Sequence, residues 1–335
     1  MMKRYAQIVG VGSYLPERIM TNADLEKLVD TSDEWITSRT GIRERRVVAE
    51  GETTSDLAAR AARIAMDRAG VSGDEIDLLY LGTTSPDYIL PSTACQTQAK
   101  LGLTCPALDT LAACSSFVYA LHAAASAIEA GRADTVLVIG AEALTRHIDF
   151  SDRGTCVLFG DGAGAVVLKA GDEPGVESVV LGADGSQGDA LIIPAGGAAH
   201  PATAETVAAG DQYVKMLGND VYRFAIKVIP SSTLEALAAS GYTVDDLTWL
   251  VPHQANKRII DTVDERLGID DSRVYIGLDK KGNTSAASIP LALDDLYTSG
   301  QLSPGNLLAL VGFGAGLTWG AAVVRWTLPA YNERD

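Results

Sequence analysis

The sequence predicts an α/β fold in which one unit occurs twice. Short apolar runs bounded by turn residues alternate with long helical patterns, and this alternation is typical of sheets covered by helices on both faces. The second observation is an internal repeat. Asp77–Leu81 (DLLYL) resembles Asp246–Leu250 (DLTWL), and Ala127–Arg132 (AIEAGR) resembles Leu296–Gln301 (LYTSGQ). Because only two copies are recognisable, we expect a duplicated domain rather than a solenoid.

The individual elements follow from the same patterns. Buried strands are expected where the apolar run is short and continuous, at Thr135–Ala141, Gly164–Leu168 and Leu307–Gly312. Helices are expected to end where a glycine follows the last apolar position, at Thr54–Ala69, Ser115–Ala130 and Ser231–Ser240. The polar stretch Ala170–Gly175 is the expected junction, so the predicted halves are residues 1–172 and 173–335.

The composition is that of a globular chain with a large core, since 47% of the 335 residues are hydrophobic and 21% are charged. The 27 basic and 43 acidic residues give a formal charge of −16, which argues against a nucleic-acid partner. The four cysteines form no C-x-x-C pair, so we expect no disulfide framework, no metal site and a reducing, cytoplasmic location.

The sequence predicts neither a signal peptide nor a membrane helix. The N-terminus has a basic start but no signal-peptide cleavage pattern. The uncharged stretch Leu307–Val324 is better explained by two buried strands around a glycine turn than by a membrane helix. We therefore expect no association with a membrane.

Cys114 is the candidate nucleophile. It lies in DTLAACSSFVYAL, between a strand-like apolar segment and a long helix. At the N-terminus of a helix, backbone N–H groups and the helix dipole favour a thiolate. Most free cysteines are small buried hydrophobic side chains, so the position alone leaves both interpretations open.

His253 and Asn283 become candidates through the repeat. His253 directly follows the second-half strand that matches Leu78–Leu81, and ligands of α/β sheets collect at the carboxyl ends of strands. Asn283 (KKGNTSAASIP) falls on the repeat position of Cys114. Either residue alone is an ordinary turn residue. Two halves related by a pseudo-twofold axis would bring their helix N-termini together, and the three side chains would share one pocket.

Two glycine clusters, Phe159–Gly164 and Val311–Gly320, need a separate interpretation. Neither has the full G-x-G-x-x-G spacing and neither precedes an amphipathic helix, so a nicotinamide site is not expected. In the second cluster, glycine instead allows the backbone to approach a reacting centre closely.

In these settings Cys114, His253 and Asn283 resemble the active site of the β-ketoacyl-acyl-carrier-protein synthase III family, condensing enzymes of the thiolase superfamily. The resemblance covers nearly the whole chain. Its further motifs are Thr31–Arg46, Pro91–Gln96, Asp152–Leu168, Val251–Asn256, Gly282–Pro290 and Gly312–Gly320. The family implies a duplicated thiolase-like fold, a five-layered α-β-α-β-α sandwich, in a homodimer.

The resemblance also implies the reaction, a decarboxylative Claisen condensation of an acyl-CoA primer with malonyl-acyl-carrier protein that initiates fatty-acid synthesis. Cys114 would take the acyl group from CoA. His253 and Asn283 would donate hydrogen bonds to the malonyl thioester oxygen while carbon dioxide leaves, which requires a neutral His253. The backbone N–H groups of Cys114 and Ala315 would form a second oxyanion hole. Acyl-CoA is a substrate in this scheme, and no cofactor is expected.

The implied CoA site begins at Trp35, Arg39 and Arg153, which would surround the adenine. An aromatic face and guanidinium groups suit a base and its phosphates. Further in, the residues that would line the pantetheine tunnel are Gly218 and Asn219, with Asn256 at the inner end.

Leu90 occupies the position from which, in the family, the partner subunit closes the acyl pocket. A phenylalanine there shortens the pocket. Leu90 therefore suggests room for a longer or branched primer.

An acidic carrier protein should be repelled by a chain with a charge of −16, so docking needs a local basic patch. We expect it at Arg223, Lys227, Lys257 and Arg258, which are spaced as helix neighbours in two segments. A solvated helix surface is the other interpretation of these residues.

Three other functions remain open. The same fold and cysteine would serve a thiolase-fold acyltransferase or a starter-unit synthase of polyketide or other secondary metabolism. An inactive subunit of a polyketide synthase pair would not need Cys114, His253 and Asn283 together. A Cys-His hydrolase would need a group that orients the histidine as a base, and the sequence shows none.

Overall fold

The computed structural model describes residues 4–332. Residues 1–3, which carry part of the basic start of the chain, and residues 333–335 lie outside the described residues. The helices are α1 (Asn22–Leu25), α2 (Asp33–Thr40), α3 (Thr54–Ala69), α4 (Thr93–Leu101), α5 (Ser116–Glu129), α6 (Arg153–Cys156), α7 (Ala204–Ala208), α8 (Gly218–Ser240), α9 (Lys257–Leu267) and α10 (Ser288–Thr298).

The strands are distributed over both halves of the chain. They are β1 (Tyr5–Tyr14), β2 (Arg18–Thr21), β3 (Glu44–Val47), β4 (Leu78–Gly82), β5 (Ala107–Thr110), β6 (Thr135–Glu142), β7 (Gly162–Gly171), β8 (Val176–Ala183), β9 (Leu191–Ile192), β10 (Lys215–Met216), β11 (Trp249–Pro252), β12 (Leu307–Gly314) and β13 (Thr318–Arg325). Short 3₁₀ turns connect several of them, and two of these turns, Ala113–Ser115 and Ser285–Ala287, directly precede α5 and α10.

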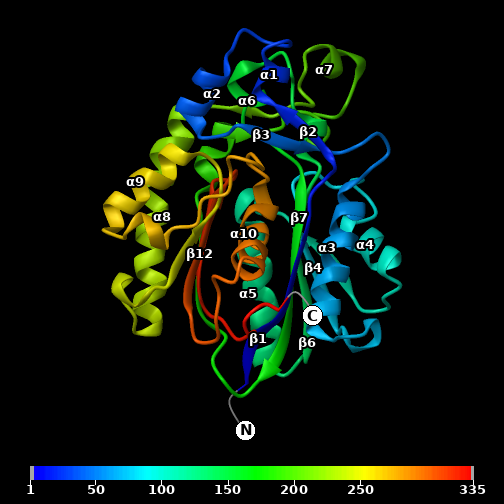
Figure 1. Ribbon diagram of the computed structural model, residues 1–335. Helices are drawn as coiled ribbons and strands as arrows, with labels where there is room; N and C mark the ends of the chain where they lie inside the picture. Colours follow the sequence, from blue (N-terminus) through cyan, green and yellow to red (C-terminus); the bar gives the residue numbers. More distant parts are fainter. Residues whose placement is uncertain (1–3, 333–335) are drawn as a thin grey trace.

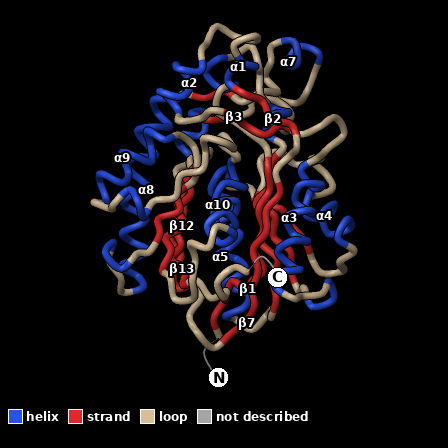
Figure 2. Tube along the Cα trace, in the orientation of Figure 1, coloured by secondary structure: helices blue, strands red, loops and turns tan. Residues whose placement is uncertain are grey.

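Two main sheets and three layers of helices form a five-layered α-β-α-β-α sandwich, which confirms the expected fold (Figures 1 and 2). The first sheet has the strand order β1-β7-β6-β4-β5, and the second has β11-β12-β13-β8. Helices α5 and α10 lie between the sheets. Helices α3 and α4 cover the outer face of the first sheet, and α8 covers that of the second with α9 packed against it.

The strand order shows the duplication directly. Read from the other edge, the second sheet runs β8-β13-β12-β11, which repeats the chain order of β1-β7-β6-β4. Val274 forms an isolated parallel bridge to Leu250 beside β11, at the place that β5 takes in the first sheet. The division at residues 172 and 173 stays a prediction; β7 ends at Gly171 and β8 begins at Val176.

The register of the repeat at the centre of the molecule differs from the expected one. Ala113 and Ser285 both have φ of 47°, and each is the first residue of the 3₁₀ turn before α5 or α10. The structural counterpart of Cys114 is therefore Ala286, and Asn283 lies in the loop before it. The expectation was wrong because α10 is shorter than α5, so matching Gly131 with Gly300 at their ends shifts the register at their starts.

Most predicted elements are confirmed. Helix α3 has the expected bounds, and α5 differs by one residue at each end. Leu307–Val324 forms strands β12 and β13 with a turn between them. No helix within residues 4–332 is both long and apolar enough to cross a membrane.

The third predicted helix begins earlier than expected, because α8 continues through Pro230. A proline cannot donate to the carbonyl four residues before it, here that of Ile226. The guanidinium of Arg266 on α9 donates to that carbonyl at 2.6 Å, so the freed acceptor is satisfied from the neighbouring helix.

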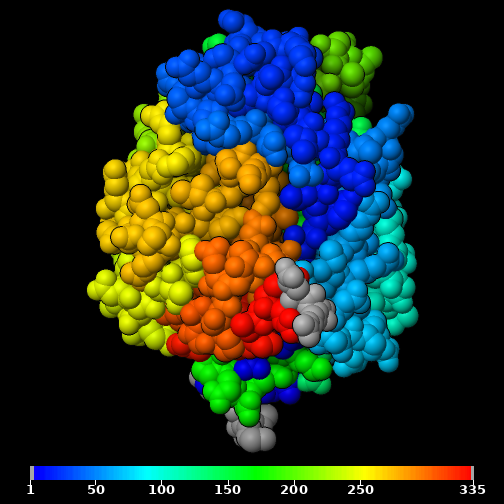
Figure 3. Space-filling view, viewed as in Figure 1, coloured from blue at the N-terminus to red at the C-terminus, as the bar shows by residue number. Residues whose placement is uncertain are grey.

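One end of the molecule is built from segments of both halves. Met20, Leu25, Ile36 and Ile42 of the first half belong to the same buried cluster as Ile259 on α9. Helices α1, α2, α6 and α7 gather at this end, at the top of Figure 1. Figure 3 shows the surface of the same end, mostly blue with green at its right. This end of the molecule is therefore part of the interface between the two halves. The site described next opens there.

Candidate active site

Cys114 lies where the chain leaves β5 and enters α5. Its 3₁₀ turn begins with the left-handed Ala113, and the Cys114 side chain is only 6% exposed. A local hydrogen bond holds the turn, because the Ala112 N–H donates to Ser116 Oγ at 2.8 Å. The predicted helix N-terminus for Cys114 is thus confirmed, and the residue before it, Ala113, has a strained backbone conformation.

The Cys114 side chain is a neutral thiol, whereas its position at a helix N-terminus alone suggests a thiolate. Burial, together with the nearby carboxylate of Glu142, raises the pKa of the Cys114 thiol to about 12. Removal from water destabilises the thiolate more than the helix N-terminus stabilises it. In the free protein Cys114 is therefore a neutral thiol.

His253 follows the last residue of β11 and points into the interior. The backbone N–H of His253 donates to Val311 O, on the adjacent parallel strand, at 2.7 Å. The residue is only 2% exposed. Nδ1 lies 2.6 Å from Ser288 Oγ, and the Phe313 ring packs edge-on against the imidazole with 5.3 Å between centroids. Burial lowers the pKa of His253 to about 3, so the imidazole is neutral, as the reaction scheme requires.

Asn283 is positioned by the opposite half of the chain. Its N–H donates to Leu158 O at 2.8 Å, and its carbonyl accepts from Gly160 N at 3.0 Å. Its side-chain Oδ1 accepts from Ser285 N at 2.9 Å. Since Oδ1 accepts this hydrogen bond, the Asn283 amide nitrogen is available to donate to a ligand.

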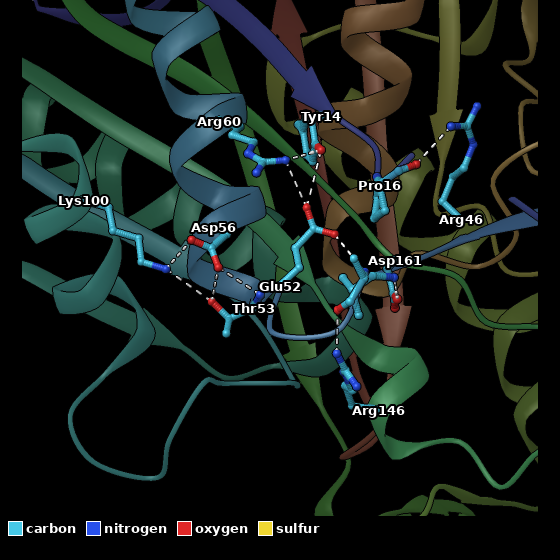
Figure 4. A network of polar contacts seen from close by, with 12 residues as sticks. Tyr14, Pro16, Arg46, Glu52, Thr53, Asp56, Arg60, Lys100, Arg146 and Asp161 are labelled. Atoms are coloured by element: carbon cyan, nitrogen blue, oxygen red, sulfur yellow. Dashed lines mark hydrogen bonds and ion pairs between the residues drawn. The ribbon is translucent and has the colours of Figure 1, made fainter. Parts of the chain in front are cut away.

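The segment that holds Asn283 is supported by the buried Asp161. The Asp161 carboxylate accepts from Val48 N and Thr145 N, each at 2.8 Å, and its own N–H donates to Arg46 O at 2.9 Å. Figure 4 shows Asp161 and Arg46 in the polar network that extends from this point toward α3. The position of Asn283 thus depends on hydrogen bonds across three separate loops.

The glycines of the second cluster allow the close approach that the sequence predicts. A Cβ on Gly314 would lie 2.6 Å from Cys114 N, and one on Gly312 would lie 3.1 Å from Ser115 Cα. The end of β12 can therefore lie against the Cys114 turn only without side chains. Ala315 follows in the wall of a cavity that also contains Cys114, and the oxyanion role of their N–H groups stays a prediction.

One cavity of about 440 Å³ brings the predicted residues together. Cys114, His253 and Asn283 all line it. The residues expected to bind CoA line the same cavity: Trp35, Arg39, Arg153, Gly218, Asn219 and Asn256. Their position indicates a route from the surface to the thiol.

The outer end of this cavity differs from the expected adenine site. The Arg153 guanidinium lies 4.8 Å from the centre of the Trp35 ring and donates to Asp30 O at 2.9 Å. The two side chains contact each other, so a base can enter between them only after Arg153 moves. Asn256 is also engaged, because its Oδ1 caps α9 by accepting from Arg258 N at 2.9 Å.

The residues predicted to dock a carrier protein lie on two adjacent helices. Helices α8 and α9 lie side by side (Figure 1). Arg223 and Lys227 are exposed on α8, and Lys257 and Arg258 are exposed on α9. Arg223 and Lys257 form ion pairs within their own helices, with Asp220 and Asp261. Arg258 also lines the large cavity, so the expected patch adjoins its mouth.

A second cavity of about 420 Å³ meets Cys114 from the other side and has an apolar lining. Leu90 does not line it, because this side chain is 84% exposed on the surface of its own chain. Closure of the cavity by Leu90 of a second copy therefore stays a prediction.

Sequence reasoning missed two polar residues at the site. Ser288, in the motif that contains Asn283, contacts His253. Glu142 ends the otherwise apolar strand β6 and is fully buried, and its carboxylate accepts from Thr84 N at 3.1 Å and Ala286 N at 3.4 Å, which links the halves. Burial raises the pKa of Glu142. An acid at the end of a fully apolar strand was the signal that could have identified it.

Comparisons with known proteins agree with this geometry. The family model "3-Oxoacyl-[acyl-carrier-protein (ACP)] synthase III" matches residues 108–185, and the model of its C-terminal part matches residues 237–326. The chain is 54% identical over 328 residues to a beta-ketoacyl-[acyl-carrier-protein] synthase III of Xanthomonas axonopodis pv. citri, covering 97% of this chain and 100% of that protein.

Solved structures give the same result. The 3-oxoacyl-[acyl-carrier-protein] synthase III of Aquifex aeolicus VF5 superposes with a TM-score of 0.89 at 42% identity, covering 96% of this chain and 100% of that one. The priming beta-ketosynthase of the R1128 polyketide pathway superposes with a TM-score of 0.91 at 37% identity, covering 98% of both chains.

Proposed function

The chain belongs to the 3-oxoacyl-[acyl-carrier-protein] synthase III family, and we propose that Cys114, His253 and Asn283 carry out that family's reaction in it. The reaction is the condensation of an acyl-CoA with malonyl-acyl-carrier protein, an acyl transfer that initiates fatty-acid synthesis. The observation that carries the residue assignment is the single cavity that joins these three side chains to the predicted CoA residues.

In the first half-reaction Cys114 accepts the acyl group. Its sulfur attacks the thioester carbonyl of acyl-CoA, the bond to the CoA sulfur breaks, and the thiol proton ends on the departing CoA. The backbone N–H groups of Cys114 and Ala315 are our candidates for stabilising the tetrahedral oxyanion. The acyl chain enters the second cavity, while CoA leaves through the first.

In the second half-reaction His253 and Asn283 stabilise an enolate. Malonyl-acyl-carrier protein loses carbon dioxide, and negative charge collects on its thioester oxygen, where the Asn283 amide nitrogen and the imidazole donate hydrogen bonds. The carbanion attacks the acyl group on Cys114. The 3-oxoacyl product leaves on the carrier protein, and the Cys114 thiolate takes a proton from solvent.

The hydroxyl of Ser288 contacts the imidazole of His253. It lies 2.6 Å from His253 Nδ1 and 2.9 Å from Ser285 O, and its one proton can be donated to either acceptor. The donor role that we propose for His253 requires this proton to be donated to Nδ1, which places the single proton of the neutral imidazole on Nε2.

The experiment that tests this function follows both half-reactions separately. The protein is expected to gain one acyl group on Cys114 from acyl-CoA and then to release carbon dioxide in equal amount with 3-oxoacyl product when malonyl-acyl-carrier protein is added. Peptide mass spectrometry and trapped carbon dioxide are the measurements. Transfer of the acyl group to an alcohol or amine without release of carbon dioxide would favour the simple acyltransferase instead.

A starter-unit synthase of polyketide metabolism is the second candidate, supported by the similarity to the R1128 priming ketosynthase. The higher identity to the Xanthomonas synthase, 54% against 37%, favours fatty-acid synthesis. The two candidate functions differ in the carrier protein that they use, because each pathway supplies its own. Activity with one carrier protein and not the other therefore distinguishes them.

We propose that Arg223 and Lys227 on α8 dock the carrier protein. Changing both to glutamate is expected to raise the KM for malonyl-acyl-carrier protein about tenfold at low salt, because charge complementarity governs encounter with an acidic partner. The KM for malonyl-CoA, which lacks the protein surface, should stay within about twofold.

The matched control for this surface is Arg132→Glu with Lys169→Glu, which makes the same change in net charge at an exposed and a half-buried position, both outside the patch and both cavities. It should leave both KM values unchanged. Equal effects of the two double variants would mean that net charge, rather than a patch on α8, governs binding.

A homodimer is our inference for the assembly. Strand β5 is an edge of the first sheet, and an unpaired edge strand is a surface that proteins normally cover. Large apolar side chains are exposed around it: Tyr88, Ile89, Leu90, Leu108 and Leu111. A second copy paired along β5 would bury them. We also infer a cytoplasmic location, which the four free cysteines support.

A further inference from the structure

The two 3₁₀ turns at the centre of the molecule allow one half of the chain to be compared with the other. Ala113–Ser115 and Ser285–Ala287 pack against each other, and the first residue of each has φ of 47°. In the first half this position is an alanine, so the strained conformation does not depend on a hydroxyl. The hydroxyl of Ser285 therefore needs an explanation other than the shape of its turn.

This hydroxyl is buried and has no hydrogen-bond partner within residues 4–332. Ser285 is only 1% exposed. Its backbone N–H donates to Asn283 Oδ1 at 2.9 Å, so the loop is held without the hydroxyl. Because a buried hydroxyl without a partner is unfavourable, its presence points to a partner that forms during the reaction.

The other hydroxyls in the wall of the second cavity are already engaged. Thr318 Oγ1 donates to a backbone carbonyl at 2.9 Å, and Thr84 Oγ1 donates to the Glu142 carboxylate at 2.9 Å. That carboxylate also accepts from Ser85 Oγ at 2.5 Å, so it does not depend on Ser285. Among the hydroxyls that line this cavity, only that of Ser285 lacks a partner in the described part of the chain.

Cys114 is the reactive group beside this hydroxyl. Cys114 and Ser285 both line the second cavity, whereas His253 and Asn283 line only the first. Burial is the largest influence on the pKa of Cys114 and raises it, and the Ser285 side chain is the largest influence that lowers it. The hydroxyl thus favours the charged sulfur, from a different cavity than the two residues assigned to decarboxylation.

We propose that Ser285 is a further catalytic residue, whose hydroxyl donates a hydrogen bond to the Cys114 sulfur whenever that sulfur carries negative charge. The charge develops when the sulfur attacks acyl-CoA and again when the carbanion displaces it from the acyl group. A hydroxyl can rotate its proton toward the sulfur while its oxygen stays in place. This inference rests on the role of Cys114 as the nucleophile proposed above.

Ser285→Ala is the first test, since the same conformation already holds an alanine at Ala113. We expect formation of the acyl adduct on Cys114 to slow about tenfold, because a hydrogen bond to a charged group contributes roughly this factor. Alkylation of Cys114 by iodoacetamide should slow by a similar factor at every pH from 6 to 9, because the thiolate fraction falls. Peptide mass spectrometry measures both rates.

Release of carbon dioxide separates this role from a structural one. When Cys114 is acylated beforehand and malonyl-acyl-carrier protein is then added, the initial rate of decarboxylation by Ser285→Ala should stay within about twofold of the parent rate. The variant keeps the backbone N–H that Asn283 Oδ1 accepts. A loss of decarboxylation as large as the loss of acylation would mean that Ser285 only holds the loop, and would overturn the proposal.

Two further variants complete the test. Ser285→Gly also lacks the hydroxyl but takes a positive φ without strain, so both of its rates should match those of Ser285→Ala. Thr97→Val removes another buried hydroxyl that has no partner within residues 4–332, at a position on α4 that lines neither cavity, and should behave as the parent protein. Parent rates of acylation and alkylation in Ser285→Gly would contradict the proposal.

The same assays separate this inference from the function beneath it. Iodoacetamide labels the thiolate without any acyl-CoA, so alkylation tests Ser285 independently of the reaction. If the parent protein gains no acyl group on Cys114, the proposed function fails. If the parent protein is acylated and releases carbon dioxide while the Ser285 variants equal it in every rate, the condensing function stands and only the role of Ser285 is wrong.

Discussion

Replacing Asn283 by alanine is expected to slow decarboxylation of malonyl-acyl-carrier protein by a factor on the order of 10²–10³ while the acylation of Cys114 changes only a few-fold. The side chain donates to the malonyl oxygen in the second half-reaction and has no part in the first. Removing one donor from an oxyanion site costs this amount because the remaining donors cannot move to replace it. The measurements are release of labelled carbon dioxide and, separately, the rate of adduct formation with acyl-CoA.

Asn283→Asp is the matched variant. Asp keeps an oxygen that can accept from Ser285 N, the hydrogen bond that measures 2.9 Å in the parent protein, but it has no amide proton to donate. It should therefore lose decarboxylation at least as completely as the alanine variant, since a carboxylate also repels the enolate. Normal decarboxylation by the aspartate variant would mean that Asn283 serves only to hold the loop.

Alkylation of Cys114 by iodoacetamide is expected to accelerate about tenfold for each pH unit between pH 6 and 9. The reactive species is the thiolate, and burial raises the pKa of the thiol to about 12, so the neutral form predominates throughout this range. Each unit of pH then multiplies the thiolate fraction by ten. His253 adds no bend to the profile, because its lowered pKa of about 3 keeps it neutral above pH 5.

Peptide mapping makes this measurement specific, since Cys95 is also exposed to the reagent. A Cys114→Ser protein, which should show no label at that peptide, is the control. A rate that levels off near neutral pH would show that the helix N-terminus already stabilises a thiolate in the free protein, against the effect of burial.

The candidate residues of the site could be found from local patterns and the internal repeat, whereas the reaction assigned to them followed from the resemblance to a family of condensing enzymes. Cys114 precedes a long helical pattern, His253 follows a strand, and Asn283 lies in a glycine-containing loop. Each signal is local, so a single chain reveals it. The internal repeat then indicated that elements from both halves meet, and the first cavity contains all three residues.

The exact correspondence of the halves could not be predicted in the same way. Matching the glycines at the ends of α5 and α10 paired Cys114 with Asn283, whereas the structural counterpart is Ala286. Matching sequence patterns does not show that α5 and α10 differ in length. The difference becomes clear only from the structure, where Ala113 and Ser285 take the same strained conformation before the two helices. Each of these turns packs against a strand of the other half, Ala113–Ser115 against β12 and Ser285–Ala287 against β6.

By itself the sequence determined which groups are available: a thiol at a helix start, an imidazole, an amide, and glycines where backbones meet. Only the tertiary structure decided their states. The thiol is neutral because the fold removes it from water, Asn283 presents its amide nitrogen because Ser285 N occupies its oxygen, and an apolar cavity extends behind the sulfur. Desolvation, hydrogen-bond direction and cavity volume arise from residues far apart in the chain, and local patterns do not encode them.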